Sequence, residues 1–162
     1  MHPSAWIAPT ATLIGDVTVE ADASVWYGAI VRADFGPVLI REGANVQDGS
    51  VIHSGSETPT EIGPGATVGH LCVLHGCVIG AEAVIGNGSV VQDGAEVGPR
   101  ALVAAGSTVP PGARIPPQTV VSGPKAESRG PLSKGARWWV ENNPAAYRRL
   151  ARQHKETARP VR

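Results

Sequence analysis

Aromatic side chains are scarce in this sequence, at 4% of its 162 residues. A core must therefore be built from aliphatic and small side chains, and 42% of the residues are hydrophobic. No apolar run reaches about 18 residues, the length that indicates a membrane-spanning helix, and no apolar segment of the secretory type follows Met1. We therefore expect a soluble, non-secreted, cytoplasmic protein of one domain's length that does not associate with membranes.

Cysteine is also rare. Cys72 and Cys77 are the two cysteines of the chain, which is too few for the disulfide framework of a small secreted protein. Both occupy positions in the repeat described below where a small side chain faces inward. We therefore interpret both as buried thiols that behave as small hydrophobic groups.

The chain has no net charge, but its charges are unevenly distributed. Residues 1–124 hold four basic and eleven acidic side chains, whereas residues 125–162 hold ten basic and three acidic ones. A basic tail can bind nucleic acid. This tail also carries large apolar residues, so we favour docking on an acidic body, its own or that of a neighbouring copy, and expect no nucleic-acid partner.

A six-residue repeat covers most of the chain and predicts its fold. Aliphatic residues recur at every sixth position, a small residue often stands four positions later, and glycine often precedes it, as suits a corner with positive φ. The pattern indicates a parallel β-helix in which three hexads form one triangular coil. The aliphatic positions fall in four runs: Ile7, Leu13, Val19, Val25, Val31; Ile40, Val46, Ile52; Ile62, Val68, Leu74; and Ile79, Ile85, Val91, Val97, Val103, Val109, Ile115, Val121.

About eighteen hexads predict about six coils over residues 1–124, stacked at about 4.8 Å. The pattern closely resembles the hexapeptide-repeat proteins, whose β-helix is left-handed. The predicted fold class is therefore an all-β repeat, a left-handed parallel β-helix with a C-terminal α-helix. Residues 125–162 are predicted to form a linker and a helical segment that packs on the β-helix. Ser133 is a candidate N-cap for a helix to about Asn142, and Asn143-Pro144 is expected to start a second helix to about His154.

The repeat also places outward-facing side chains. His53 and His75 each follow an inward aliphatic residue on the same face, so they should stack in adjacent coils, within reach of one metal ion. His70 lies around a corner, on the preceding face. A three-fold trimer would bring His70 of one subunit to His53 and His75 of the next, which gives three sites per trimer.

Further polar residues fall in the same columns of the repeat. Arg32 should lie one coil below His53. Asp48 should lie below His70, and Asn87 above it. Gln47 directly precedes Asp48, and Asp34 follows Arg32 closely.

Three segments carry a resemblance to a known family. VRAD (31–34), NVQDGSVIH (45–53) and VGHLCVLHGCVIG (68–80) closely resemble the gamma-class carbonic anhydrases and their homologues, over nearly the whole chain. The resemblance implies a homotrimer with Zn²⁺, or Fe²⁺ or Co²⁺, bound by His53, His70 and His75 at each interface. A metal-bound hydroxide would then attack CO₂ to form bicarbonate, which makes the predicted enzyme a lyase.

The resemblance also implies roles for the surrounding polar residues. It places Gln47 beside the metal-bound water and makes Gln47, Arg32 and Asp34 the catalytic candidates. It also implies that Arg32 and Asp48 form ion pairs between subunits, with Asp34 in the same network.

Two departures from the family pattern keep other functions open. Phe35 stands where the best-known member has a glutamate, and the short connection 54–61 leaves only Glu57 and Glu61 as candidate proton shuttles. One alternative is a catalytically weak or inactive metal-binding homologue with another small-molecule role. The other is a hexapeptide acyltransferase that uses one histidine as general base with an acyl-CoA.

Overall fold

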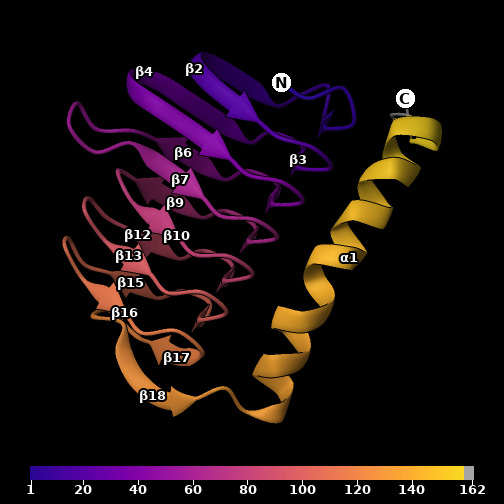
Figure 1. Ribbon diagram of the computed structural model, residues 1–162. Coiled ribbons are helices and arrows are strands. Elements are labelled where there is room, and N and C mark those ends of the chain that lie inside the picture. The colour runs from indigo at the N-terminus through magenta and orange to yellow at the C-terminus, as the bar shows by residue number, and fades with distance from the viewer. Residues whose placement is uncertain (159–162) are drawn as a thin grey trace.

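The computed structural model describes residues 1–158 and shows a parallel β-helix with one long helix along its flank (Figure 1). The predicted left-handed β-helix of about six coils is confirmed. Within the described residues, no helix is both long enough and apolar enough to cross a membrane.

The coils stack three faces of short strands. The first face holds β1 (Trp6–Ile7), β3 (Ser24–Val25), β5 (Asn45–Val46), β8 (Thr67–Val68), β11 (Val84–Ile85), β14 (Leu102–Val103) and β17 (Thr119–Ser122). The second face holds β6 (Val51–His53), β9 (Val73–His75), β12 (Val90–Val91) and β15 (Thr108–Val109). The third face holds β7 (Thr60–Ile62), β10 (Val78–Ile79), β13 (Glu96–Val97) and β16 (Arg114–Ile115). The longer strands β2 (Thr12–Val19) and β4 (Ile30–Ile40) span the second and third faces.

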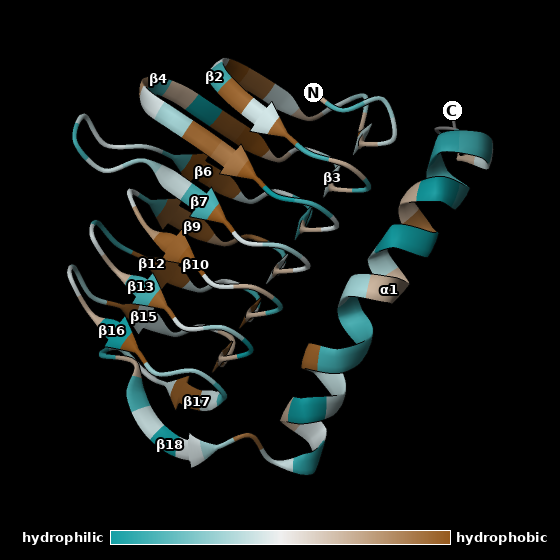
Figure 2. Ribbon diagram, in the orientation of Figure 1, coloured by the Kyte–Doolittle hydropathy of each residue, from teal (hydrophilic) through white to brown (hydrophobic). Residues whose placement is uncertain are grey.

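The aliphatic residues of the repeat form the core. Val46, Val68 and Ile85 are fully buried and stack in register on the first face. Figure 2 shows hydrophobic residues along the strands of the stack, whereas the helix is mostly hydrophilic. Cys72 and Cys77 are unpaired and buried, as predicted, and burial raises the pKa of the Cys77 thiol to about 12.

The corners depend on left-handed backbone. One corner column holds Gly28, Gly49, Gly88 and Gly106, all at φ of 67–68°. Glycine adopts this conformation without steric cost because it has no Cβ. Leu71 takes the same corner at φ 57°, between His70 and the buried Cys72.

The last coil is covered by a strand instead of an open linker. β18 (Glu127–Pro131) lies in the segment expected to be a linker and pairs antiparallel with β17. Its pairing satisfies backbone groups of β17 that no further coil would reach.

A single helix, α1 (Lys134–Thr157), follows, so the expected break at Asn143-Pro144 is wrong. Its start is correct, because the Ser133 side chain accepts a hydrogen bond from the Ala136 N–H at 3.2 Å. Pro144 lies inside the helix and is buried beside Gly65. A proline removes one helical hydrogen bond, but packing of the helix on the β-helix offsets this local cost.

The helix runs back along the first face towards the first coil, where it contacts β1, β3 and β5 (Figure 1). The rings of Tyr147 and Trp26 lie 5.3 Å apart, and the hydroxyl of Tyr27 lies 3.0 Å from His154 Nδ1. Arg152 pairs with Asp22 at 3.3 Å. The basic segment thus docks on the acidic body of its own chain.

Removing a core side chain should destabilise the stack. We expect Ile85→Ala to lower the free energy of unfolding by about 2–5 kcal/mol, because it leaves a cavity between coils that cannot collapse. Val78→Ala, at a partly exposed position of the third face, should cost less than about 1 kcal/mol. Urea unfolding monitored by circular dichroism checks both values, and equal losses would contradict this account of the core.

Candidate functional site

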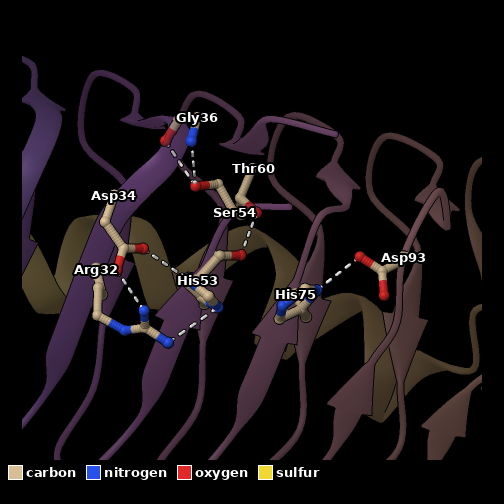
Figure 3. A network of polar contacts seen from close by, with 8 residues as sticks. All are labelled: Arg32, Asp34, Gly36, His53, Ser54, Thr60, His75 and Asp93. Atoms are coloured by element: carbon tan, nitrogen blue, oxygen red, sulfur yellow. Dashed lines mark hydrogen bonds and ion pairs between the residues drawn. The ribbon is translucent and has the colours of Figure 1, made fainter. Parts of the chain in front are cut away.

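Arg32, His53 and His75 form a ladder across three coils of the second face (Figure 3). Their strands pair in parallel, with Arg32 opposite His53 and His53 opposite His75. The two imidazole rings lie 4.8 Å apart between centroids. The stacking of His53 on His75 predicted from the repeat is therefore present.

Both ring nitrogens of His53 are used within the chain. Nε2 lies 2.8 Å from Asp34 Oδ1, and the guanidinium of Arg32 lies 3.4 Å from Nδ1. Arg32 also pairs with Asp34. The hydrogen bonds from His53 and then from Arg32 hold the pKa of Asp34 below its ordinary value. Asp34 therefore stabilises the folded chain above the ordinary carboxyl pKa, and this stabilisation is lost as the pH falls through the lowered pKa.

His75 has a carboxylate partner that the sequence analysis missed. Its Nδ1 lies 2.6 Å from Asp93 Oδ1, while Nε2 has no hydrogen-bond partner within residues 1–158. Val91 pairs with Leu74, so Asp93, two residues after Val91, lies in the next coil close to the position opposite His75. The repeat could therefore have placed Asp93 beside His75.

His70 lies in the predicted column between Asp48 and Asn87. Its Nδ1 is 2.9 Å from Asp48 Oδ2, and its backbone N–H donates to Asn87 Oδ1 at 3.1 Å. Across the described chain, no group is hydrogen-bonded to His70 Nε2. A ring with Nδ1 held by a carboxylate and Nε2 free has the arrangement of a general base.

The predicted Zn²⁺, Fe²⁺ or Co²⁺ requires correction. Within residues 1–158, no group of three or more His, Cys, Asp or Glu side chains is arranged to hold a metal ion. His70 lies around the corner from the His53–His75 pair, and each of the three imidazoles is engaged by a different aspartate of the same chain. The ligand set His53, His70 and His75 therefore does not form a metal centre in this chain.

The other predicted residues also have partners within the chain. Arg32 pairs with Asp34, and Asp48 pairs with His70. Glu61 pairs with Arg41 on the third face, away from the histidines. The exposed ring of Phe35 lies 5.7 Å from that of His53.

A cavity of about 370 Å³ lies between α1 and the first face, and His70 stands on its lining. Helix residues, among them Trp139 and Tyr147, contribute a wall that was not predicted as part of the site. Burial raises the pKa of Tyr147. The polar and aromatic side chains of the lining are Gln47, Thr67, His70, Asn87, Trp139, Asn143 and Tyr147.

Gln47 presents a hydrogen-bond acceptor to this cavity. The Asn45 amide nitrogen donates to Thr67 Oγ1 and to the Ala66 carbonyl, so its oxygen accepts the Gln47 amide at 3.0 Å. The Gln47 oxygen is thereby turned away from Asn45. The residue is only 3% exposed, yet this oxygen is neither sealed off nor bonded within the described chain.

The comparisons with known proteins agree with the fold. Residues 59–93 and 76–111 match the family model "Bacterial transferase hexapeptide (six repeats)". A Bacillus cereus protein, provisionally described as an acetyltransferase, is similar at a TM-score of 0.93 and 36% identity, over 96% of this chain and 90% of that one. A hexapeptide transferase family protein from Anaplasma phagocytophilum is similar at 0.90 and 33%, over 94% and 90%. The chain belongs to the hexapeptide transferase family.

One curated relative of this member of the hexapeptide transferase family is carnitine operon protein CaiE of Escherichia coli. It is 43% identical over 95 residues, which are 59% of this chain and 48% of CaiE. The chain therefore spans about half the length of the curated relatives that it matches. Hexapeptide-repeat β-helix proteins are typically trimers.

Gly69 is required for the His70–Asn87 contact. A Cβ added there would lie 2.5 Å from Asn87 Oδ1 and 2.8 Å from the Ile85 carbonyl oxygen. We expect Gly69→Ala to cost about 1–3 kcal/mol of stability and to expose the His70 amide to hydrogen exchange. Gly135→Ala, in α1 with nothing within 4 Å, should leave stability unchanged or raise it by up to about 1 kcal/mol. Urea unfolding and amide exchange measure both effects, and an unchanged His70 amide would contradict the assignment.

Proposed function

We propose that this protein is an acyltransferase that moves an acyl group from an acyl-CoA to a small acceptor bound between α1 and the first face. One observation carries the proposal. His70, with Nδ1 beside the Asp48 carboxylate and Nε2 free, stands on the lining of the cavity. Membership of the hexapeptide transferase family and the description of the Bacillus cereus relative support the same class of reaction.

His70 acts as the general base in this proposal. Its Nε2 takes the proton from the acceptor N–H or O–H as that nitrogen or oxygen attacks the thioester carbonyl carbon. The tetrahedral intermediate then expels the CoA sulfur, and His70 returns the proton to it. Asp48 holds the ring and stabilises the transient imidazolium.

The cavity supplies groups that orient an acceptor. The Gln47 oxygen accepts a hydrogen bond from an N–H or O–H of the acceptor. Tyr147 and Trp139 of α1 enclose it from the helix side. These contacts hold the nucleophile near His70, and positioning of this kind contributes much of the acceleration in a two-substrate reaction.

The homotrimer is part of the proposal. In it, the first face of one subunit lies near the second face of the next. The second face offers an apolar column for this contact. Ile30, Val51 and Val73 are in register and partly exposed beside Arg32, His53 and His75.

Interconversion of CO₂ and bicarbonate is the second candidate function. The observation that favours it is the grouping of Arg32, Asp34, His53 and His75 on one face, as the resemblance to the gamma-class carbonic anhydrases implies. We rank acyl transfer above CO₂ hydration, because acyl transfer needs only the His70–Asp48 pair and the cavity that the structure contains. Stopped-flow CO₂ hydration on the same preparation tests the second candidate.

The general base is tested by substitution of His70. We expect His70→Gln to reduce acyl transfer from acetyl-CoA to a panel of small amines and alcohols by about 10²-fold or more, the usual contribution of a general base. Product formation is followed by chromatography. His2→Gln, near the N-terminus and away from the cavity, is the matched control and should retain the rate. No transfer by the unchanged protein, or an equal rate in His70→Gln, would overturn the proposal.

The subunit arrangement is tested with two valines of equal exposure. Val73 on the second face and Val78 on the third face are both 42% exposed. We expect Val73→Asp to dissociate the trimer, because a buried unpaired carboxylate would oppose association. Val78→Asp should leave it intact. Light scattering after size-exclusion chromatography distinguishes the outcomes, and a monomeric unchanged protein would rule out the trimer.

A further inference from the structure

We propose that the cavity beneath α1 binds a neutral, linear carboxamide, with Gln47 and Asn87 recognising the two ends of its –CO–NH– group. This inference rests on the proposed function, since it names the class of molecule held beside His70. Asn87 becomes a specificity-determining residue, a role that neither the repeat nor the resemblance assigns to it.

Gln47 recognises the N–H of the ligand. The Ala66 carbonyl can only accept a hydrogen bond, so it orients the Asn45 amide, and Asn45 in turn orients Gln47. These two hydrogen bonds leave the Gln47 carboxamide oxygen facing the cavity. At 3% exposure, the residue cannot easily turn over to present its NH₂ group. A ligand without an N–H or O–H would leave this acceptor unpaired and desolvated, which is costly.

Asn87 recognises the C=O of the ligand. The backbone N–H of His70 is a fixed donor, and it uses the Asn87 oxygen at 3.1 Å. The Asn87 amide nitrogen must therefore point elsewhere, and it has no partner within residues 1–158. Gly69 permits this position, because any Cβ there would meet the Asn87 oxygen at 2.5 Å. Both residues line the cavity, so Gln47 offers it an acceptor and Asn87 a donor, the complement of an amide.

The repeat explains why the ligand should be linear. Gln47, Gly69, Gly86 and Ala104 each follow an inward aliphatic residue of the first face, so they stack in one column at about 4.8 Å per coil. Beyond Gln47 the column has no large side chain, which leaves a groove along the stack. Its far end is lined by Leu102, Ala104 and Ala105, with Trp139 of α1 beside them. A short apolar chain fits this end.

The lining also indicates that the ligand is uncharged. Among residues 1–158, no Asp, Glu, Lys or Arg lines the cavity, and Asp48 is already paired with His70. A charged ligand group would lose its hydration with no opposite charge to replace it. An amide needs only the two hydrogen bonds that Gln47 and Asn87 offer.

Two isosteric probes test the acceptor. N-methylhexanamide and methyl hexanoate differ by one N–H, and each is titrated into the full chain by ligand-observed NMR. We expect the amide to bind about tenfold more tightly than the ester. In Gln47→Met, which removes the acceptor and keeps the length, the difference should disappear. Equal binding of the two probes by the unchanged protein would overturn the proposal without any need for a variant.

Asn87→Asp tests the donor. The aspartate can still accept from the His70 N–H but replaces the free NH₂ group by an oxygen, so the affinity for both probes should fall about tenfold. Asn142→Asp makes the same charge change on the exposed side of α1, where the Asn142 side chain bonds to the Trp138 carbonyl, and should bind as the unchanged protein does. Equal affinities in Asn87→Asp and Asn142→Asp would overturn the role of Asn87.

The NMR titrations with the two probes measure binding and do not depend on whether the protein catalyses acyl transfer. Amide-selective binding without acyl transfer would retain this inference and reject the proposed acyltransferase. Acyl transfer that depends on His70, with no preference for the amide probe, would reject this inference and retain the acyltransferase.

Discussion

Parallel backbone pairing between successive coils fixes which side chains of this protein stand next to one another. Each inward aliphatic residue pairs with its equivalent one coil away, as Val46 does with Val68 and Val68 with Ile85. A shift of one residue would turn this core outward, so burial of the aliphatic column enforces the register. The outward residues inherit that register, and the histidines, aspartates and amides of the candidate site are brought together as members of columns.

The candidate site combines this regular surface with one irregular element. The columns supply the pair His70–Asp48 and the two amides, and they leave an open groove where glycines follow the core residues. Helix α1 closes that groove with Trp139, Asn143 and Tyr147. The helix is held by aromatic contacts in its C-terminal half, among them Tyr147 on Trp26 and His154 on Tyr27. The cavity therefore depends on how the end of the chain packs on its beginning.

Backbone groups determine the chemistry of the cavity. Amide side chains can present either end, but a carbonyl can only accept and an N–H can only donate. The Ala66 carbonyl and the His70 N–H are fixed by the β-helix, and through Asn45 and Asn87 they decide what the cavity offers. The rigid stack thereby fixes which end of each amide side chain, oxygen or NH₂ group, is presented to the cavity.

The six-residue period was enough to predict the β-helix, its register and the columns of His53 with His75 and of Asp48 with His70 and Asn87, because it leaves one consistent way to bury the aliphatic residues. The partner Asp93 was missed, although the pairing of Val91 with Leu74 places it one residue beyond the position opposite His75. The continuation of α1 through Pro144 could not be predicted, because packing against the stack outweighs the local preference for a break. The pairing of each histidine with an aspartate became visible only in the structure, since side-chain direction depends on neighbours in space. The cavity likewise could not be predicted, because its two walls are separated by much of the chain.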